Sequence, residues 1–416
     1  MAIPRILAPL RHGPFMRYMC GEAISMTGTW MQMFAQGWIL TTLTSSAFVL
    51  GAINFAAGVP MLFLTMLGGS FADRYDKRLI LHTALTMQVL IAATIGYLIF
   101  KQEIAIWHVA VAATLLGITA AFEVPAVSAF VPELVSKAEM ASAIALDRSV
   151  FHATRLIGPA LAGYLVGALG VGSAYFVNAA TFLALMVAIL TIPRRAQGTA
   201  EEEEKRKGPM SEGLAFVRQD RPTRTMILMM VAMTFFTSPF LMITMPLYSR
   251  NTLGLGPDMM GLLMAISGAG SFTGSLGLLS IARERRTLAL RLAAISSTGA
   301  LVGLSLAPGF TVAAVSLVFF TLGLSTAFGL SNIVIQERAP DFIRGRVSAV
   351  AGMAFFGILP FSGLLISGLV DLLGMRVTLM AAAVCYGLST AILLGRPGFS
   401  ETSSRDSDVP EPASTA

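Results

Sequence analysis

Long apolar runs dominate the sequence and constrain its fold more than any other feature. A helix needs about 20 mostly apolar residues to cross the hydrocarbon core of a bilayer. By that measure, six runs precede a charged stretch in the middle of the chain and six follow it. They lie near 17–41, 47–72, 79–100, 105–126, 143–169 and 171–192, and then near 224–249, 257–281, 287–307, 310–334, 346–372 and 375–395. The sequence therefore predicts an all-α membrane protein of twelve transmembrane helices.

The composition excludes an ordinary water-soluble fold. The 416 residues are 55% hydrophobic and only 12% charged, whereas soluble domains carry about 25% charged residues. Both cysteines, Cys20 and Cys385, lie within apolar runs near opposite ends of the chain, so no disulfide framework is expected. The N-terminus has no short hydrophobic region followed by a small-residue cleavage site, so we expect the first helix to be retained.

The basic residues predict the orientation in the membrane. Of the 29 Lys and Arg residues, only Lys101, Arg250 and Arg376 fall in one set of gaps, and Arg155 lies within a helix. All the others occupy the alternate gaps and the two tails, which the positive-inside rule assigns to the cytoplasm. An odd number of spans would disrupt this alternation. The spread of charge over many gaps argues against nucleic-acid binding and indicates a multi-pass membrane protein with both termini cytoplasmic.

A polar segment and an internal repeat divide the chain. Residues 194–223, with EEEEKRK at 201–207, predict a cytoplasmic linker between an N-terminal half (1–193) and a C-terminal half (224–396), and residues 397–416 have the composition of a disordered tail. GGSFADRYDKRLIL at 68–81 resembles LLSIARERRTLAL at 278–290. IGPALAGYLVGALG at 157–170 resembles ILPFSGLLISGLVDLLG at 358–374. Two pseudo-symmetric halves of six helices are expected, with a binding site at the midplane between them.

Several motifs resemble those of known transporters. GGSFADRYDKR is similar to the loop motif between helices two and three of the major facilitator superfamily, with Gly69, Asp73, Arg74, Lys77 and Arg78 in matching places and Asp76 where Gly is usual. Longer stretches resemble the bacterial third drug:proton antiporter family, which includes enterobactin and macrolide exporters. These are GTWMQ (28–32), LTSSAFVLG (43–51), FEVPAVSAFVPELV (122–135), RLIGPALAG (155–163), YFVNAATF (175–182) and RGRVSAVAG (344–352). The resemblance implies a major facilitator fold in which helices one, four, seven and ten line a central cavity.

A polar stripe follows the first helix. At about 100° per residue its members fall within an arc of roughly 80°; they are Glu22, Ser25, Thr29, Gln32 and Gln36. Polar groups within a membrane helix are costly and are expected to face a wet cavity or one another. The alternative is that Glu22 snorkels to the membrane surface while Gln32 and Gln36 join helices.

Three further helices carry polar faces and supply other cavity candidates: Thr119 with Glu123 in the fourth, Thr237, Thr244 and Tyr248 in the seventh, and Ser325, Asn332 and Gln336 in the tenth. Hydrogen bonding of the hydroxyls to their own backbone is an equally good interpretation of the seventh helix. The chain also has 24 Met and 26 Phe. Such polarizable side chains suit a promiscuous apolar pocket, and the alternative is that most of them face lipid or pack between helices.

The fifth span contains charges that point to proton coupling. Arg148, His152 and Arg155 lie on one side of this helix, and a buried Arg requires an acidic partner or carbonyl groups; Glu123 and Asp147 are the candidates. We therefore expect Glu22, Glu123, Asp147 and Arg155 to take part in proton coupling. The pattern Gly158, Pro159 and Gly163 resembles the antiporter motif of drug exporters, although the small residues by themselves also permit close helix packing.

The loop motif predicts a latch between the halves. The resemblance implies that the Asp73 carboxylate meets the N-terminal end of the eleventh helix, where Arg344 and Arg346 add positive charge. An anion is favoured at a helix N-terminus, and such a contact would close the cytoplasmic gate in one state only. The alternative is a loop whose charges only fix the topology.

These observations favour a secondary transporter, monomeric and without a cofactor, that exports an amphipathic small molecule by proton-coupled alternating access. The sequence does not identify the cargo, and two alternatives stay open: an importer or lysophospholipid transporter, and a nontransporting receptor or assembly protein. An enzyme is not expected, because the histidines form no metal-spaced cluster and no nucleophile motif or Gly-rich phosphate loop is present. The four histidines are His12, His82, His108 and His152.

Overall fold

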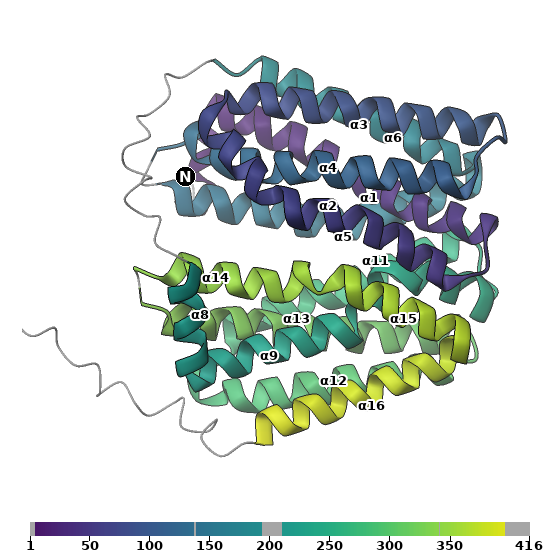
Figure 1. The fold of residues 1–416 in the computed structure, drawn as a ribbon, viewed down its shortest axis with the longest axis vertical. Helices are drawn as coiled ribbons and strands as arrows, with labels where there is room; N and C mark the ends of the chain where they lie inside the picture. Colours follow the sequence, from purple (N-terminus) through teal and green to yellow (C-terminus); the bar gives the residue numbers. More distant parts are fainter. Residues whose placement is uncertain (1–4, 137–138, 194–209, 341, 396–416) are drawn as a thin grey trace, which may run out of the picture.

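The computed structural model describes residues 5–136, 139–193, 210–340 and 342–395, and every element in these ranges is helical (Figure 1). The first part contains η1 (Arg5–Arg11), α1 (Gly13–Leu43), α2 (Ala47–Arg74), α3 (Lys77–Phe100), α4 (Ile106–Phe130), η2 (Val131–Leu134), α5 (Met140–Leu169) and α6 (Val171–Leu190). The second contains α8 (Met210–Gln219), α9 (Arg221–Phe236), η4 (Phe240–Thr244), α10 (Met245–Leu247), η5 (Tyr248–Thr252), α11 (Pro257–Gly277), η6 (Leu278–Ser280), η7 (Arg283–Arg285), α12 (Arg286–Leu306), α13 (Phe310–Arg338), α14 (Arg344–Gly352), η8 (Met353–Gly357), α15 (Leu359–Leu373) and α16 (Met375–Gly395).

Within the described residues, ten helical segments are long and apolar enough to cross a membrane. They confirm the predicted class, an all-α membrane protein. Helices α1 and α5 have 31 and 30 residues but are not among the ten, because both carry polar and charged side chains at many positions, including the predicted stripe of α1. The count of twelve spans stays a prediction.

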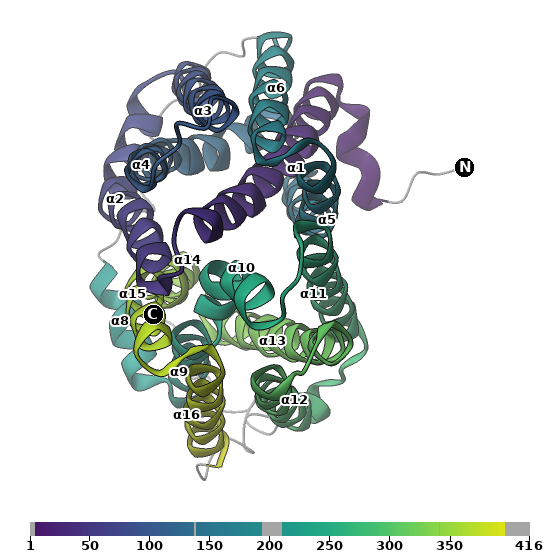
Figure 2. The same ribbon diagram turned by 90° about the vertical axis from the view of Figure 1, so that its right-hand side faces the viewer.

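The helices form two groups that lie one above the other in Figure 1. The first group comprises α1 to α6 and the second comprises α8 to α16. They meet along two seams, one between α5 and α11 and the other between α2 and α15. We call the end of the bundle where α6 ends and α9 begins the linker end, and the end where α1 ends and α2 begins the opposite end. Figure 2 looks onto the opposite end, where α1 and α10 approach each other near the centre.

Two helices that were predicted as continuous are interrupted. The seventh span consists of α9 followed by π-helical turns around α10, and Pro239, which has no backbone N–H to donate, lies at the break. The eleventh consists of α14 and α15 joined by the π-helical η8, just before Pro360. Such π-helical turns occur frequently at functional sites, and both interrupted segments pack against the seams between the groups.

Local chemistry repeats between the groups. Helices α5 and α15 both end in a glycine with a φ of 83°, Gly170 and Gly374. In each case the glycine N–H bonds to the carbonyl four residues earlier, Val166 at 3.0 Å and Val370 at 2.9 Å. Positive φ is readily accessible to glycine, so the same turn closes the two segments whose sequences resemble each other.

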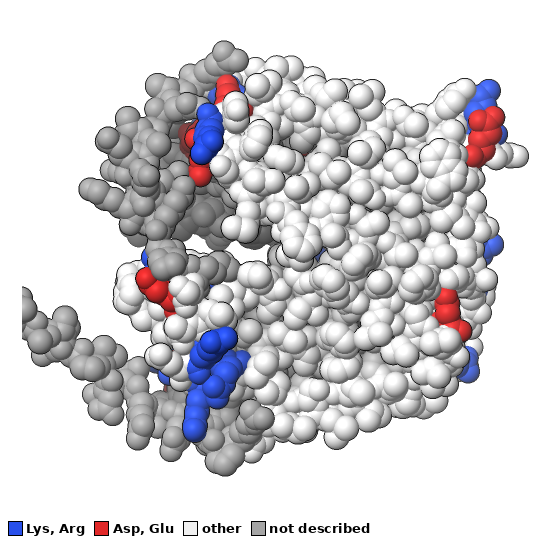
Figure 3. Space-filling view, in the orientation of Figure 1, with Lys and Arg blue, Asp and Glu red and all other residues white. Residues whose placement is uncertain are grey.

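The outer surface suits a lipid environment. Large apolar side chains lie exposed on the outward faces, among them Phe63, Met66 and Leu288. Figure 3 shows Lys, Arg, Asp and Glu near the two ends of the bundle, with a broad uncharged surface between them. Each group also has cores of its own, such as the cluster around Phe15 and Phe130 and the cluster around Leu301 and Phe320. Contacts between the groups are therefore additional to the packing that holds each one together.

Candidate functional site

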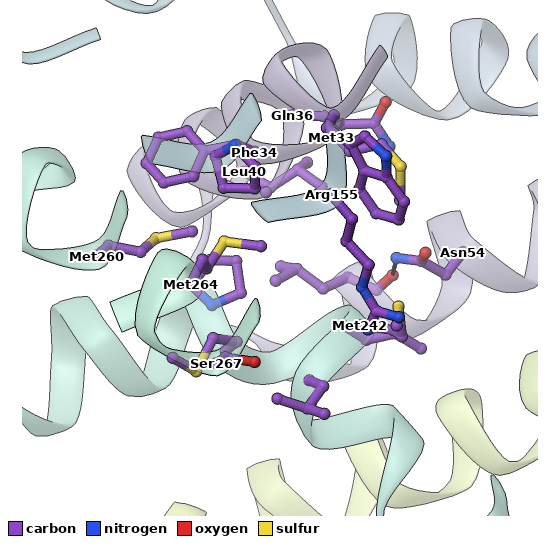
Figure 4. Close-up of a pocket in the computed structure, with 18 of the residues that line it drawn as sticks. Met33, Phe34, Gln36, Leu40, Asn54, Arg155, Met242, Met260, Met264 and Ser267 are labelled. Carbon is purple, nitrogen blue, oxygen red and sulfur yellow. Dashed lines mark hydrogen bonds between the residues drawn. The ribbon is translucent and has the colours of Figure 1, made fainter. Parts of the chain in front are cut away.

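A cavity lies between the two groups. Its walls come from α1, α2 and α5 on one side and from the segment around η4 and α10 together with α11 on the other (Figure 4). The lining residues are Trp30, Met33, Phe34, Gln36, Gly37, Leu40, Leu50, Asn54, Arg155, Pro159, Leu241, Met242, Ile243, Met245, Pro246, Met260, Met264, Ser267 and Gly268. The interrupted seventh span thus forms one wall of the cavity.

Close contacts shut the cavity toward the opposite end. A Cβ atom added to Gly37 would lie 2.7 Å from Cγ of Pro246, so this glycine is what allows α1 and α10 to approach each other so closely. Nearby, Arg250 donates from Nη1 to the hydroxyl of Thr41 at 3.2 Å, and its guanidinium carbon lies 5.9 Å from the centre of the Trp38 ring. The two groups are thereby joined at the opposite end by packing and by a polar contact.

A second closure at the opposite end joins α15 to the first turn of α2. The Asp371 carboxylate accepts hydrogen bonds from the Ser46 hydroxyl, from the backbone N–H of Ala47 at 2.6 Å and from the backbone N–H of Phe48 at 3.1 Å. The first N–H groups of a helix have no partner within the helix and attract negative charge. Asp371 therefore caps a helix of the other group. We call this contact the Asp371 clamp.

The two seams have the small residues that close packing requires. A Cβ on Gly163 of α5 would lie 2.8 Å from the Cα of Gly261 in α11, and a Cβ on Gly58 of α2 would lie 2.5 Å from Pro360 of α15. On the side of the linker end, in contrast, Figure 3 shows a hollow between the groups. The groups thus make close contacts at the opposite end and along the seams.

The lining is mostly apolar and rich in sulfur. Five methionines contribute to it: Met33, Met242, Met245, Met260 and Met264. Two of these, Met242 and Met245, belong to the methionine-rich seventh span, whereas Met226 and Met229 of the same span are buried in the core. Flexible thioether side chains adapt to ligands of different shapes, so the surface suits a variable apolar cargo.

Arg155 carries the only charge among the described residues that line the cavity. Its guanidinium carbon lies 5.6 Å from the centre of the Trp30 ring. In Figure 4 the side chain reaches across the cavity toward Met242, with Asn54 at one side. No described residue offers Arg155 a hydrogen bond or an ion pair. Neither Glu123 nor Asp147 pairs with it, although both were the expected candidates.

The three candidate acids gather elsewhere in the first group. Glu22 is buried in α1 and lies within electrostatic range of Glu123 and Asp147. The Gln88 side chain donates from Nε2 to the Glu123 carboxylate, and the fully buried Tyr18 lies within reach of the same acids. The structure therefore brings Glu22, Glu123 and Asp147 together as an acidic cluster, while the fourth coupling candidate, Arg155, lies in the cavity wall. Trp30 of that wall is eight residues from Glu22, or about 12 Å along α1.

The polar stripe of α1 divides between two environments. Gln36 lines the cavity. Gln32 is buried and accepts from Nδ2 of Asn178 in α6 at 2.8 Å, so it joins two helices. Thr29 donates to the carbonyl of Ser25 at 3.0 Å, and Ser25 itself is buried. The polar face of α1 thus packs against α6 at Gln32 and lines the cavity at Gln36.

The other cavity candidates lie in helix contacts. Thr119 and Thr237 donate to carbonyls of their own helices, at 2.9 Å to Leu116 and 2.6 Å to Met233. Thr244 is buried, and Tyr248 donates to the Leu304 carbonyl at 2.7 Å. On α13, Ser325 bonds Ser275 of α11 at 2.7 Å, the Asn332 amide donates to Phe328, and the Gln336 carbonyl accepts from Arg344. None of these residues is among those that line the described cavity.

Residues of the loop motif brace the linker end of the first group. Asp76 caps α3 by accepting from the Arg78 N–H at 3.0 Å. Lys77 pairs with Glu133 at 2.6 Å, and the Arg78 guanidinium donates to the carbonyls of Ile192 and Pro193 beyond α6. Asp73 and Arg74 are exposed, and a Cβ on Gly69 would meet nothing within 4 Å. In the second group Arg346 pairs with Glu212 of α8. The Asp73 latch stays a prediction.

The antiporter-like motif lies at contacts that need small residues. Gly158 packs against Trp30 of α1, where a Cβ would lie 2.5 Å from the Trp30 Cβ, and Gly163 forms the seam with α11. Pro159 lines the cavity between them. The packing interpretation of these glycines accounts for their positions, and their part in coupling stays a prediction.

Sequence reasoning missed the contacts at the opposite end. It assigned no role to Asp371, to Arg250 or to Asn54. A signal was present for Asp371, which is a solitary acid at the end of the repeated segment 358–374. Nothing in one sequence showed that α2 would begin beside it.

Comparisons with known proteins agree with this architecture. A family described as transmembrane secretion effector, within the major facilitator superfamily, matches residues 5–413. The multidrug efflux pump Tap of Mycolicibacterium fortuitum is 24% identical over 90% of this chain and 93% of its own length. The staphyloferrin A transporter of Staphylococcus aureus is 24% identical over 83% of this chain and 87% of its own length.

Among solved structures, a bacterial homologue of the human lysosomal transporter Spinster superposes with a TM-score of 0.73 at 14% identity, over 97% of this chain and all of that one. This likeness supports the fold, and the family match extends over nearly all of the sequence. The chain belongs to the transmembrane secretion effector family of major facilitator transporters.

Proposed function

We propose that the protein exports an amphipathic small molecule across a bacterial inner membrane by proton-coupled alternating access. In this proposal twelve spans form two six-helix halves, 1–193 and 224–396, and α1 and α5 complete the ten apolar spans. The linker end is cytoplasmic, as the distribution of basic residues indicates. The observation that carries the proposal is the methionine-rich cavity between the groups, next to the close contacts that join them at the opposite end.

This arrangement corresponds to one state of an alternating-access cycle. The Asp371 clamp and the contact between Arg250 and Thr41 hold the extracellular side shut. When they break, the two halves can rock about the cavity and expose it to the outside. Because each group also has a core of its own, such a motion changes the contacts between the groups without unfolding either half.

The acidic cluster is the proposed proton site. Three carboxylates in one poorly solvated region repel one another, and a proton that arrives at Glu22 or Glu123 reduces this repulsion. Glu22 and the cavity-lining Trp30 share α1, so a change at the cluster has a direct path to the cargo site. The similarity to a multidrug efflux pump and to a staphyloferrin A transporter supports an amphipathic small molecule as the cargo.

The test is reconstitution of the full chain into proteoliposomes with an imposed pH gradient. We expect proton movement on addition of transported members of a panel of dyes, macrolides, siderophores and lysolipids. Glu22→Gln and Glu123→Gln should each abolish pH-driven flux while cargo exchange at equal pH persists. If both variants keep pH-driven flux, the coupling scheme is wrong.

Two further outcomes would replace the proposal. Net uptake of labelled cargo by intact cells, without efflux, would indicate an importer or a lysophospholipid transporter on the same fold. The absence of flux for every member of the panel, together with tight binding of a protein partner, would indicate a receptor or an assembly protein.

A further inference from the structure

Arg155 places a positive charge in the cavity, and no described residue provides it with an anionic partner. The guanidinium of Arg155 contacts the face of Trp30, and its N–H donors have no acceptor among the described residues. The Arg155 side chain lines the cavity and extends into it (Figure 4), so these donors face its open space. The other polar lining groups, Gln36, Asn54 and Ser267, are uncharged.

A charge in this position is costly unless a ligand compensates for it. Removing a charge from water carries a large penalty, and only a well-placed counter-ion and hydrogen bonds offset it. A guanidinium also presents a planar set of donors that matches a carboxylate or a similar oxyanion with two parallel hydrogen bonds. Glu123 does not fill this role, because its carboxylate accepts a hydrogen bond from the Gln88 side chain.

We propose that the cargo carries an anionic group, of the carboxylate type, that binds Arg155, while its apolar body lies on the methionine surface. This inference rests on the proposed export function and specifies its substrate class. Met33, Met260 and Met264 line the apolar part of the cavity, and Asn54 lies beside Arg155 to orient a neutral polar group of the cargo (Figure 4). A cationic amphiphile of equal size is disfavoured, because it would place a second positive charge beside Arg155 with no acid to separate them.

The test compares three probes that differ only in charge: 11-(dansylamino)undecanoic acid, its primary amide, and the corresponding undecylamine. Binding of each to the full-length protein in neutral-lipid nanodiscs is measured by dansyl fluorescence, with empty nanodiscs subtracted for partition into lipid. We expect the acid to bind at least about tenfold more tightly than the amide, which corresponds to about 1.4 kcal/mol. The amine should bind more weakly than the amide.

Variants locate this preference at one residue. Arg155→Gln should reduce the ratio of acid to amide affinity to about one, because it removes the charge that distinguishes the two probes. Arg155→Lys should retain part of the preference, because it keeps the charge and loses the planar set of donors. Arg250→Gln is the matched control: Arg250 also lies over a tryptophan of α1 but does not line the cavity, so the ratio should stay at the wild-type value.

Three results would overturn the inference: equal binding of acid and amide to the wild type, a preference that survives in Arg155→Gln, or no binding of the acid at all. Binding of the amide to Arg155→Gln shows that the variant is folded. Export of the neutral amide from proteoliposomes decides the proposed function separately. If the wild type transports the amide but does not prefer the acid, the export function holds and the role of Arg155 fails.

Discussion

The Asp371 clamp gives the most direct test of how the opposite end of the bundle is held shut. Replacing Asp371 by Ala removes three acceptor contacts with the first turn of α2. Because these contacts join the two groups, the energy that they contribute is present only while this end is closed. The variant should therefore shift the balance toward a state that is open at this end, without destabilising either group.

The size of this shift follows from the contacts. Loss of a side-chain cap at a helix N-terminus costs about 1 kcal/mol, and loss of a negative charge there costs about 0.3–1 kcal/mol at an exposed site. Asp371 is exposed, and the Ser46 hydroxyl also caps α2 by accepting from the Val49 N–H at 3.4 Å. The energy lost on removing Asp371 should therefore not exceed the sum of these two values. A total of about 1–2 kcal/mol corresponds to a shift of roughly five- to thirtyfold in the equilibrium.

The assay is a distance measurement across the opposite end. The chain has only two cysteines, so Cys20→Ser and Cys385→Ser give a background for a pair of spin labels, one in each group. Pulsed electron resonance then reports the populations of the closed and open states in nanodiscs. Glu103→Ala is the control, because Glu103 is an exposed acid in the loop that joins α3 and α4 at the same end. The reasoning is refuted if Asp371→Ala leaves the populations unchanged, or if Glu103→Ala shifts them equally.

Three further substitutions test a helix seam, a buried hydrogen bond and an ion pair. Gly163→Val places side-chain atoms against the backbone of α11 and should abolish transport while the protein still reaches the membrane; normal transport would show that the α5–α11 seam is not needed. Asn178→Leu leaves the buried Gln32 carbonyl without its donor and should lower the free energy of unfolding by about 1–3 kcal/mol, seen as a lower thermal midpoint in detergent. Asp220→Asn weakens the contact with Arg338 at the linker end and should also lower that midpoint. Burial raises the pKa of Asp220. Hydrogen bonds from Arg338 and Thr223 lower this pKa by more, so the net pKa lies below the usual 3.8. The stabilisation is therefore present above pH 3.8 and is lost as the pH falls through the depressed value, so the difference in midpoint between wild type and Asp220→Asn should vanish there; a difference that persists in strong acid would contradict this origin.

The class of fold could be predicted from the sequence because a bilayer imposes a simple length and polarity on each span. The polar face of α1 could be predicted as well, since helical periodicity places Gln32 and Gln36 on one side. Periodicity cannot say what that side meets. Gln32 faces Asn178, 146 residues away along the chain, and Gln36 faces the cavity.

The contacts of Arg155 and Asp371 could not be predicted from the sequence, for one physical reason. The sequence shows that a buried Arg needs a counter-charge, and Glu123 and Asp147 were the nearest acids by type. In the structure the acids gather around Glu22 instead, and Arg155 meets the ring of Trp30. Which of several possible partners a charge takes depends on helix rotation and on the seam between the groups, and neither is encoded by spacing within one helix.

Helices α2 and α15 suggest that one seam controls both ends of the cavity. They run antiparallel, because Asp371 near the end of α15 contacts the start of α2, while Pro360 near the start of α15 packs against Gly58 farther along α2. Asp73 lies near the end of α2, and its predicted partner is the start of the α14–α15 segment. Each helix would then carry an acid that caps the other helix, one at the opposite end, closed in this structure, and one at the linker end when that end is closed.

If the two caps form in alternate states, their losses act in opposite directions. Asp371→Ala should favour the outward-open state, and Asp73→Ala should favour the inward-open state. The double variant should therefore lie closer to the wild-type balance than Asp371→Ala alone, because in that case the two substitutions remove energy from different states. The measurement is the same spin-label distance, with a second label pair across the linker end. A double variant that keeps the full shift of Asp371→Ala would mean that Asp73 contributes nothing to a cytoplasmic closure, and the Asp371 clamp would then act alone.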